Sequence, residues 1–145
     1  MMRCACTVVL LWFCSAALAD DCTQADAQIA GTVTDYLDSW KNVATAFKEF
    51  AKCDDGEVAE GFSDKISRLL ADHWPRLPEL VQLDAKTPGL EAFVLKHLDE
   101  TINLVDAQKI SKLARHSCPS VARSLCTKIN ARLGDVENAH SSDAT

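Results

Sequence analysis

The histidines are the first candidates for chemistry in this chain, because imidazoles bind metal ions and exchange protons near neutral pH. His97 and Glu100 have the i, i+3 spacing of a helical ligand pair, but His-x-x-Glu reverses the order of the di-iron motif and has no second copy. Of the four histidines, His73, His97, His116 and His140, no two are close enough in sequence to share a helix face. We predict no metal site and no cofactor, and interpret His73 and His97 as hydrogen-bonded residues at the core edge.

The sequence also lacks the usual signals of a catalytic nucleophile. It has no Gly-x-Ser-x-Gly turn, no glycine-rich phosphate loop and no Cys-x-x-Cys pair. The densest acidic group is Asp54, Asp55, Glu57 and Glu60, and paired carboxylates can perform acid–base catalysis. Acidic residues at the start of a helix are, however, also favoured by the helix macrodipole. We therefore do not predict an enzyme and assign no catalytic residue.

Residues 1–19 have the pattern of a secretory signal peptide. Arg3 is followed by an apolar run over residues 7–13 and by the small-residue cleavage motif Ala17-Leu18-Ala19. The apolar run is too short to span a bilayer as a helix. We expect cleavage after Ala19 and a periplasmic or secreted product without a membrane anchor. This product has 126 residues and a net charge of -7.

Signal cleavage removes three of the seven cysteines and leaves Cys22, Cys53, Cys118 and Cys126. An even number of cysteines in an exported protein favours disulfide bonds. On a straight helix, however, Cys22 and Cys53 would lie ~46 Å apart, and Cys118 and Cys126 ~12 Å apart. A disulfide needs a Cα–Cα distance of ~4.4–6.8 Å. The cysteines of the first helix would thus be much farther apart than those of the last helix, and a disulfide at each end cannot make up the difference. Two disulfides between a straight first helix and a straight last helix are therefore excluded.

Three ways to satisfy this distance limit remain open. The first segment bends, with Gly31 as the expected break; Cys22 lies on a returning lead-in; or only one bond forms. Bonds within each pair, Cys22 with Cys53 and Cys118 with Cys126, would require both helices to be broken. Our preferred pairing joins Cys53 to Cys118 at two helix ends and leaves Cys22 for Cys126.

Apolar residues recur at steps of three and four after the signal, which predicts helices and no strands. The start signals are Thr23 with Asp26, Asp54-Asp55, Thr87-Pro88, Asp106 and Cys118-Pro119, and stop signals follow at Trp74-Pro75 and Gly134. We predict an all-α, compact single-domain bundle of five or six helices over residues 20–134, stapled by disulfides. Residues 135–145 are predicted to form a polar flexible tail.

The charge is unevenly distributed along the chain. Residues 20–60 contain ten acidic and three basic residues, whereas residues 61–145 contain eleven of each. Six bases lie between Asp106 and Asp135, but no aromatic residue interleaves with them and the whole chain is acidic, so nucleic-acid binding is not predicted. The asymmetry fits either solvated helix faces or an acidic surface that steers a basic protein partner.

The segments CDDGEVAEGFSD, RLLADHW and FVLKHLDET resemble a group of small exported helical proteins of proteobacteria that have no assigned function. The likeness covers residues 40–126. It implies a bacterial, periplasmic setting and transfers no active site.

Together these observations favour a protein that works by binding another protein, such as an inhibitor or an immunity protein against a toxin. The acidic residues Asp54, Asp55, Glu57 and Glu60 and the exposed edge expected near Trp74 are the predicted contacts. The alternative is a carrier that holds a small apolar ligand among Tyr36, Trp40, Phe47, Phe62 and Phe93, although such an aromatic stripe is more often plain core.

Overall fold

A computed structural model describes residues 21–99 and 101–143, with side chains as far as residue 136, and every regular element in these ranges is helical. The α-helices are α1 (Gln24–Thr34), α2 (Trp40–Phe50), α3 (Gly56–Asp72), α4 (Leu77–Asp84), α5 (Leu90–Lys96), α6 (Leu104–His116) and α7 (Arg123–Asp143). Short 3-10 turns occur at η1 (Ala51–Cys53), η2 (Trp74–Arg76) and η3 (Ser120–Ala122). The all-α class is confirmed, and the seven α-helices of the described ranges exceed the five or six predicted.

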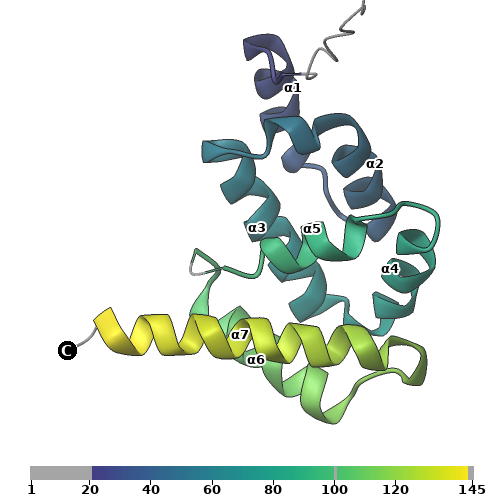
Figure 1. The fold of residues 1–145 in the computed structure, drawn as a ribbon, viewed down its shortest axis with the longest axis vertical. Helices are drawn as coiled ribbons and strands as arrows, with labels where there is room; N and C mark the ends of the chain where they lie inside the picture. The colour runs from purple at the N-terminus through teal and green to yellow at the C-terminus, as the bar shows by residue number, and fades with distance from the viewer. Residues whose placement is uncertain (1–20, 100, 144–145) are drawn as a thin grey trace, which may run out of the picture.

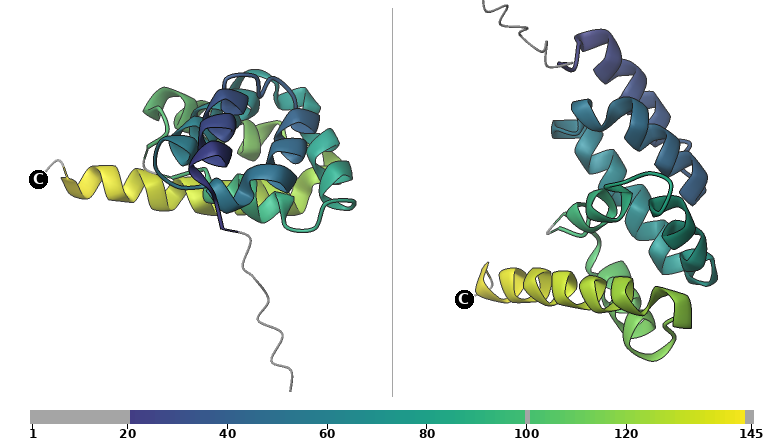
Figure 2. Two further views of the ribbon diagram at one scale, coloured as in Figure 1. Left: turned by 90° about the horizontal axis from the view of Figure 1, so that it is seen from above. Right: turned by 45° about the vertical axis from the view of Figure 1, so that its right-hand side comes forward.

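Helix α3 connects the two ends of the molecule. It packs against α1 near the amino-terminal end and against α6 near the carboxyl-terminal end, where α6 and α7 lie side by side (Figures 1 and 2). The shorter helices α4 and α5 fill the middle, where α4 contacts α2 and α5 contacts α7. The order of helices therefore places α1 at one extremity of the molecule, packed mainly on α2, η1 and α3.

The additional helix arises because the first helical segment turns back between α1 and α2. The break lies at residues 35–39, and Gly31, the predicted break, is inside α1. Ser39 caps α2 by accepting the backbone N–H of Asn42, and the Asn42 amide donates to the Tyr36 carbonyl at 3.2 Å. Polar side chains that bond to nearby backbone groups compete with helical bonding, so the turn forms here rather than at the glycine.

This turn and η3 explain the disulfide pattern. The bonds are Cys22–Cys53, with Cα atoms 4.9 Å apart, and Cys118–Cys126, with Cα atoms 6.2 Å apart. The disulfide staples are confirmed, but our preferred pairing of Cys53 with Cys118 and Cys22 with Cys126 is wrong. Each bond lies within a segment that the sequence analysis treated as one helix, and in each case the helix is interrupted.

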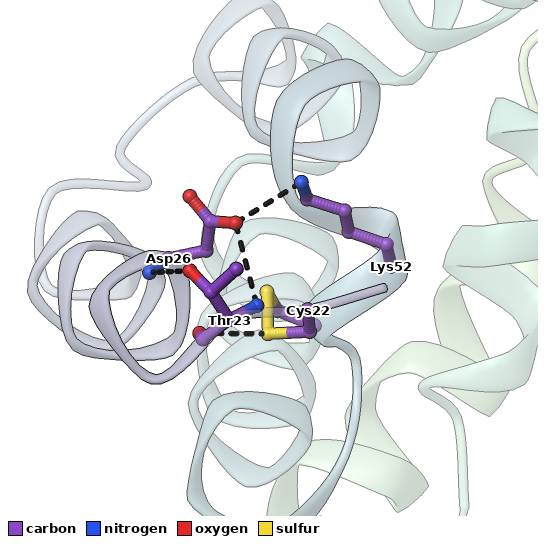
Figure 3. The surroundings of a disulfide bond; sticks show 5 residues. Cys22, Thr23, Asp26 and Lys52 are labelled. Atoms are coloured by element: carbon purple, nitrogen blue, oxygen red, sulfur yellow. Dashed lines mark hydrogen bonds and ion pairs between the residues drawn. A yellow bond between two sulfur atoms is a disulfide. The ribbon is translucent and has the colours of Figure 1, made fainter. Parts of the chain in front are cut away.

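The start of α1 is anchored by several interactions at once (Figure 3). Thr23 and Asp26 form a reciprocal capping box, which confirms the cap predicted from their spacing. Asp26 also pairs with Lys52 at 3.0 Å, next to the Cys22–Cys53 bond. The amino end of α1 is therefore tied to η1, which follows α2, by a disulfide bond and an ion pair.

Helix α5 begins later than Thr87-Pro88 indicates. It starts at Leu90 after Gly89, whose φ of 93° is in the left-handed region that glycine adopts readily. The carboxylate of Asp84, at the end of α4, accepts the backbone N–H of Glu91 at 2.8 Å. A side chain from the preceding helix thus supplies the acceptor that the sequence assigned to Thr87.

The boundaries of the last two helices also differ from the prediction. Asn103 rather than Asp106 caps α6, accepting the backbone N–H of Val105 at 2.8 Å. Helix α7 continues through Gly134 to Asp143, so the expected flexible tail is helical over residues 135–143. Val136 is buried, and this further apolar position outweighs the roughly 1 kcal/mol that glycine costs a helix interior. Residues 1–19, the predicted signal peptide, lie outside the described residues.

Candidate functional site

A groove of about 540 Å³ opens between α1 and the first turn of α3. Its walls are Gln24, Ala27, Gln28, Gly31, Thr32 and Asp35 of the α1 segment and Asp55, Glu57 and Val58 of the α3 segment. Three carboxylates from two elements therefore face one hollow. The residues on the α1 wall recur at steps of three and four, on a face of the helix next to the buried positions Ala30 and Thr34.

The acidic residues on the α3 wall have a clear local origin. Asp55 is the N-cap of α3 and accepts the backbone N–H of Gly56 at 2.8 Å, as its position in the sequence predicts. Glu57 is in the first turn, where a negative charge interacts favourably with the helix macrodipole. The fold therefore places these two acids on the groove at no cost to α3.

Asp35 on the opposite wall is placed against the helix electrostatics. It is the C-cap of α1, where the macrodipole is negative, and the last turn of α1 contains no basic residue. Within the described part of the chain, Asp35, Asp55 and Glu57 have no ion-pair partner, although six other acidic residues do. The groove thus carries three negative charges that the described fold does not neutralise.

The predicted contact residues are divided by the structure. Asp55 and Glu57 are brought together on the groove, and Glu60 is exposed but lines a different hollow of about 350 Å³ with Thr101 and Asn103. The side chain of Asp54 is only 5% exposed and pairs with Lys96, whose side chain is exposed, and with the buried His97.

Trp74 is buried rather than exposed, contrary to the sequence analysis. It is 5% exposed, and its indole N–H donates to the Ser117 carbonyl at 2.9 Å. The bond joins η2 to the end of α6, which gives the tryptophan a structural role. The exposed edge expected around this residue is therefore absent at Trp74 itself.

The sequence analysis missed the α1 wall of the groove. Gln24, Gln28 and Asp35 are spaced as one face of a helix, and this polar stripe was a readable signal. Their proximity to Asp55 and Glu57 was not readable, because it depends on the turn that folds α1 onto α3.

A second cluster of chemically capable groups lies in the core around His97. His97 is 1% exposed and is therefore not at the core edge, where we expected it. Its Nδ1 is 3.0 Å from the Ser63 hydroxyl and its Nε2 is 3.3 Å from a carboxylate oxygen of Asp54. Burial lowers the pKa of His97, although Asp54 opposes that effect.

Serine, histidine and aspartate in contact are the residue types of a hydrolase triad. Ser63, however, is only 2% exposed, so its hydroxyl is not open to a substrate in this structure. The cluster is a buried polar network, and the groove is the better candidate for contact with other molecules.

The aromatic residues proposed to line a ligand cavity mostly pack against one another. The rings of Phe47 and Phe62 contact Phe93, with centroids 4.9 and 5.0 Å away. Trp40 is fully buried, whereas Tyr36 is 71% exposed and does not belong to the cluster. The space that an apolar ligand would need among these residues is thus occupied by side chains.

Two further kinds of site were searched for among the described residues. No three histidine, cysteine or acidic side chains there are grouped as metal ligands, and no helix there has the length and apolar character needed to cross a membrane. No family model matches the chain, and no match was found among curated proteins or solved structures.

Proposed function

We propose that this chain is an exported helical protein that binds a basic protein partner through the groove between α1 and α3, as an inhibitor or immunity protein would. The observation that carries the proposal is the set of three carboxylates, Asp35, Asp55 and Glu57, that face one groove without an ion-pair partner in the described fold.

The groove suits the cationic side chains of lysine and arginine. A volume of about 540 Å³ is enough for more than one such side chain, and carboxylates from opposite walls can accept hydrogen bonds from the same guanidinium group. Gln24 and Gln28 add neutral donors and acceptors along one wall. The charges would also speed encounter with a basic protein, since ten of the acids lie in residues 20–60.

The other side of α1 offers apolar contact next to the charged groove. A hollow of about 230 Å³ lies between α1 and α2, with Val33, Tyr36 and Ala46 among its lining residues. Tyr36 and Ile29 are 71% and 53% exposed, and exposed tyrosine is frequent in the energetic centre of protein interfaces. A partner lying across α1 would therefore meet acidic groups on one side and apolar groups on the other.

The proposed location is the periplasm or the extracellular space. The signal-peptide pattern of residues 1–19 predicts export, and two disulfide bonds are typical of proteins in oxidising compartments. Occlusion of a partner needs no catalytic group, and it fits the acidic groove better than the carrier alternative fits the filled aromatic core.

The proposal can be tested by neutralising the groove. In the mature, disulfide-bonded protein, the triple variant D35N/D55N/E57Q should weaken binding of a fluorescent arginine-rich peptide by about tenfold or more, measured by anisotropy. The matched control is E60Q/D106N/D135N, which removes the same net charge at positions outside the groove.

The control decides between a specific groove and general acidity. The control variant should retain most of the affinity, and a peptide with glutamine in place of arginine should bind neither protein. Equal weakening by both triple variants would show that overall charge, and not the groove, attracts the peptide, and it would overturn the proposal.

A further inference from the structure

Four polar side chains form a continuous chain through the core. Asp54, which follows η1, contacts His97 at the end of α5; His97 contacts Ser63 of α3; and Ser63 donates a hydrogen bond to Asp99 at 3.3 Å. Ser63 and His97 are 2% and 1% exposed, and the side chain of Asp54 is 5% exposed. Water therefore has little access to the middle of this chain.

These four side chains have one fewer hydrogen available for hydrogen bonding than they have contacts with one another. Both end groups are carboxylates, which only accept hydrogen bonds when ionised. Between them, the serine has one O–H and a neutral imidazole has one N–H, so two hydrogens must serve three contacts. The contacts that have hydrogen-bond geometry are those of Ser63 with His97 and with Asp99, and both are filled only when Ser63 donates to Asp99 and the imidazole N–H is on Nδ1, where it donates to the serine oxygen.

The unfilled contact is then the one between His97 and Asp54. Nε2 of His97 and Oδ1 of Asp54 are 3.3 Å apart, and both atoms are buried without a hydrogen-bond partner. The other oxygen of Asp54 accepts from Lys96 at 2.6 Å, so Oδ1 is the oxygen left for the histidine. In the neutral state two acceptor atoms face each other inside the protein, which is unfavourable.

The charges around His97 and its burial have opposite effects on how readily it takes up a proton. Among the described residues, the charged groups around His97 are Asp54, Lys96 and Asp99, and the rings of Phe62 and Phe93 cover the imidazole. Two carboxylates and one ammonium leave a net negative charge beside a neutral histidine. Burial nevertheless lowers the pKa of His97, so Nε2 takes up a proton only below the pH at which an exposed histidine would titrate.

We propose that Asp54, His97, Ser63 and Asp99 form a buried proton-binding site, in which one proton taken up on Nε2 of His97 completes all three hydrogen bonds. Uptake turns the imidazole into an imidazolium that donates to Asp54 on one side and to Ser63 on the other. The filled chain joins the segment after Cys53 to α3 and α5. The inference concerns the interior of the fold and does not depend on the identity of a binding partner.

The first test is the protonation state of His97 in the intact, disulfide-bonded protein. Nitrogen NMR of the imidazoles should show the Nδ1–H tautomer of His97 at pH 7.5 and both nitrogens protonated at the acid end of a titration. Free histidine in the same buffer provides the reference, and His97 should titrate at lower pH than this reference. A doubly protonated His97 at pH 7.5, or an Nε2–H tautomer there, would overturn the proposal.

The second test removes single partners and uses a matched serine as control. S63A removes the acceptor for the imidazolium, and D54N offers an amide donor to Nε2 that replaces the proton; each should weaken proton binding by His97 at least about tenfold. S67A changes another buried serine of α3, which bonds the Asp64 carbonyl instead, and should leave the titration unchanged. Equal titration curves for S63A and S67A would exclude the proposed chain.

Discussion

Single residues show where the fold accepts an electrostatic cost. Asp35 caps the carboxyl end of α1, whose last turn contains no base, whereas Asp106 lies in the first turn of α6, where acids are favoured. A charge that disfavours its own helix and faces a groove is typical of a residue kept for binding. Among the groove residues, Asp35 is thus the one whose replacement should affect stability and binding in opposite directions.

Removing the charge of Asp35 should increase the stability of the protein and decrease its affinity for the peptide. D35N should raise the free energy of unfolding by about 0.3–1 kcal/mol, because it removes a negative charge from the negative end of α1. The same change should weaken binding of the arginine-rich peptide. D106N is the comparison, since it should lower the free energy of unfolding and leave binding unchanged. Denaturant titrations and anisotropy measure both, and destabilisation by D35N would contradict the electrostatic account.

His97 leads to a prediction for pH. Because burial lowers its folded-state pKa, the unfolded chain takes up a proton first as the pH falls below about 6.5. Stability contributed by neutral His97 is therefore complete above that pH and declines between the unfolded and folded pKa, by at most ~1.4 kcal/mol per pH unit. The third hydrogen bond offsets only part of the desolvation cost, so the slope remains.

The pH prediction is checked by denaturant unfolding between pH 5 and 8. H97Q should flatten the decline below about pH 6.5 that the unmodified protein shows under the same conditions. If the H97Q variant does not fold, the NMR titration of His97 in the unmodified protein gives the same sign. An unfolding free energy that does not vary over this range in the unmodified protein would contradict the prediction.

At the scale of elements, the groove depends on how closely α1 approaches α3. A Cβ at Gly61 would lie 2.9 Å from the Thr34 Cβ and 2.6 Å from its Oγ1. Thr34 is buried, β-branched and hydrogen-bonded to the Gly31 carbonyl, so it has little freedom to move aside. Only glycine at this position lets the two helices pack as they do.

This contact predicts different outcomes for two glycines. G61A should lower the free energy of unfolding by about 1–3 kcal/mol through overpacking and should disturb the groove. G31A, inside α1 with nothing within 4 Å of its new methyl group, should stabilise the protein by up to about 1 kcal/mol. Thermal or denaturant unfolding of the pair checks this, and equal effects would show that the helices do not meet at Gly61.

At the scale of the whole molecule, the two disulfides staple opposite ends. Cys22–Cys53 closes a separation of 31 residues around α1 and α2, and Cys118–Cys126 closes a separation of eight residues between α6 and α7. Neither bond links the amino-terminal end to the carboxyl-terminal end, so helix packing must hold the ends together, through α3 on α6 and through α4 and α5 on η3 and α7.

Loop length predicts which staple matters more. Replacing Cys22 and Cys53 by alanine should cost about 3–4 kcal/mol, and replacing Cys118 and Cys126 about 2–3 kcal/mol, because the longer loop gains more entropy when opened. Unfolding of both double variants measures the costs. A non-reducing peptide map should recover the two pairs, and a peptide joining Cys53 to Cys118 would contradict this structure.

Local features of the fold could be predicted because they depend on neighbours in sequence. The Thr23–Asp26 capping box, the Asp55 cap of α3 and the helical class all follow from side chains and backbone a few residues apart. The Thr87 and Asp106 caps failed for a related reason: Asp84 and Asn103 supplied better-placed acceptors. The sequence predicted that these helices form, but it did not predict which of several nearby polar residues caps each one.

The sequence by itself determined that this protein is helical, acidic in its amino-terminal half and provided with an even number of cysteines after the predicted cleavage. Only the tertiary structure decided which cysteines pair, that Asp54 is buried, and that Asp35 and Glu57 share a groove. Helix formation is a short-range property of backbone bonding and apolar spacing. Pairing, burial and grooves depend on where the chain reverses: the five-residue turn after α1 brings Cys22 to Cys53 and α1 onto α3, and η3 brings Cys118 to Cys126.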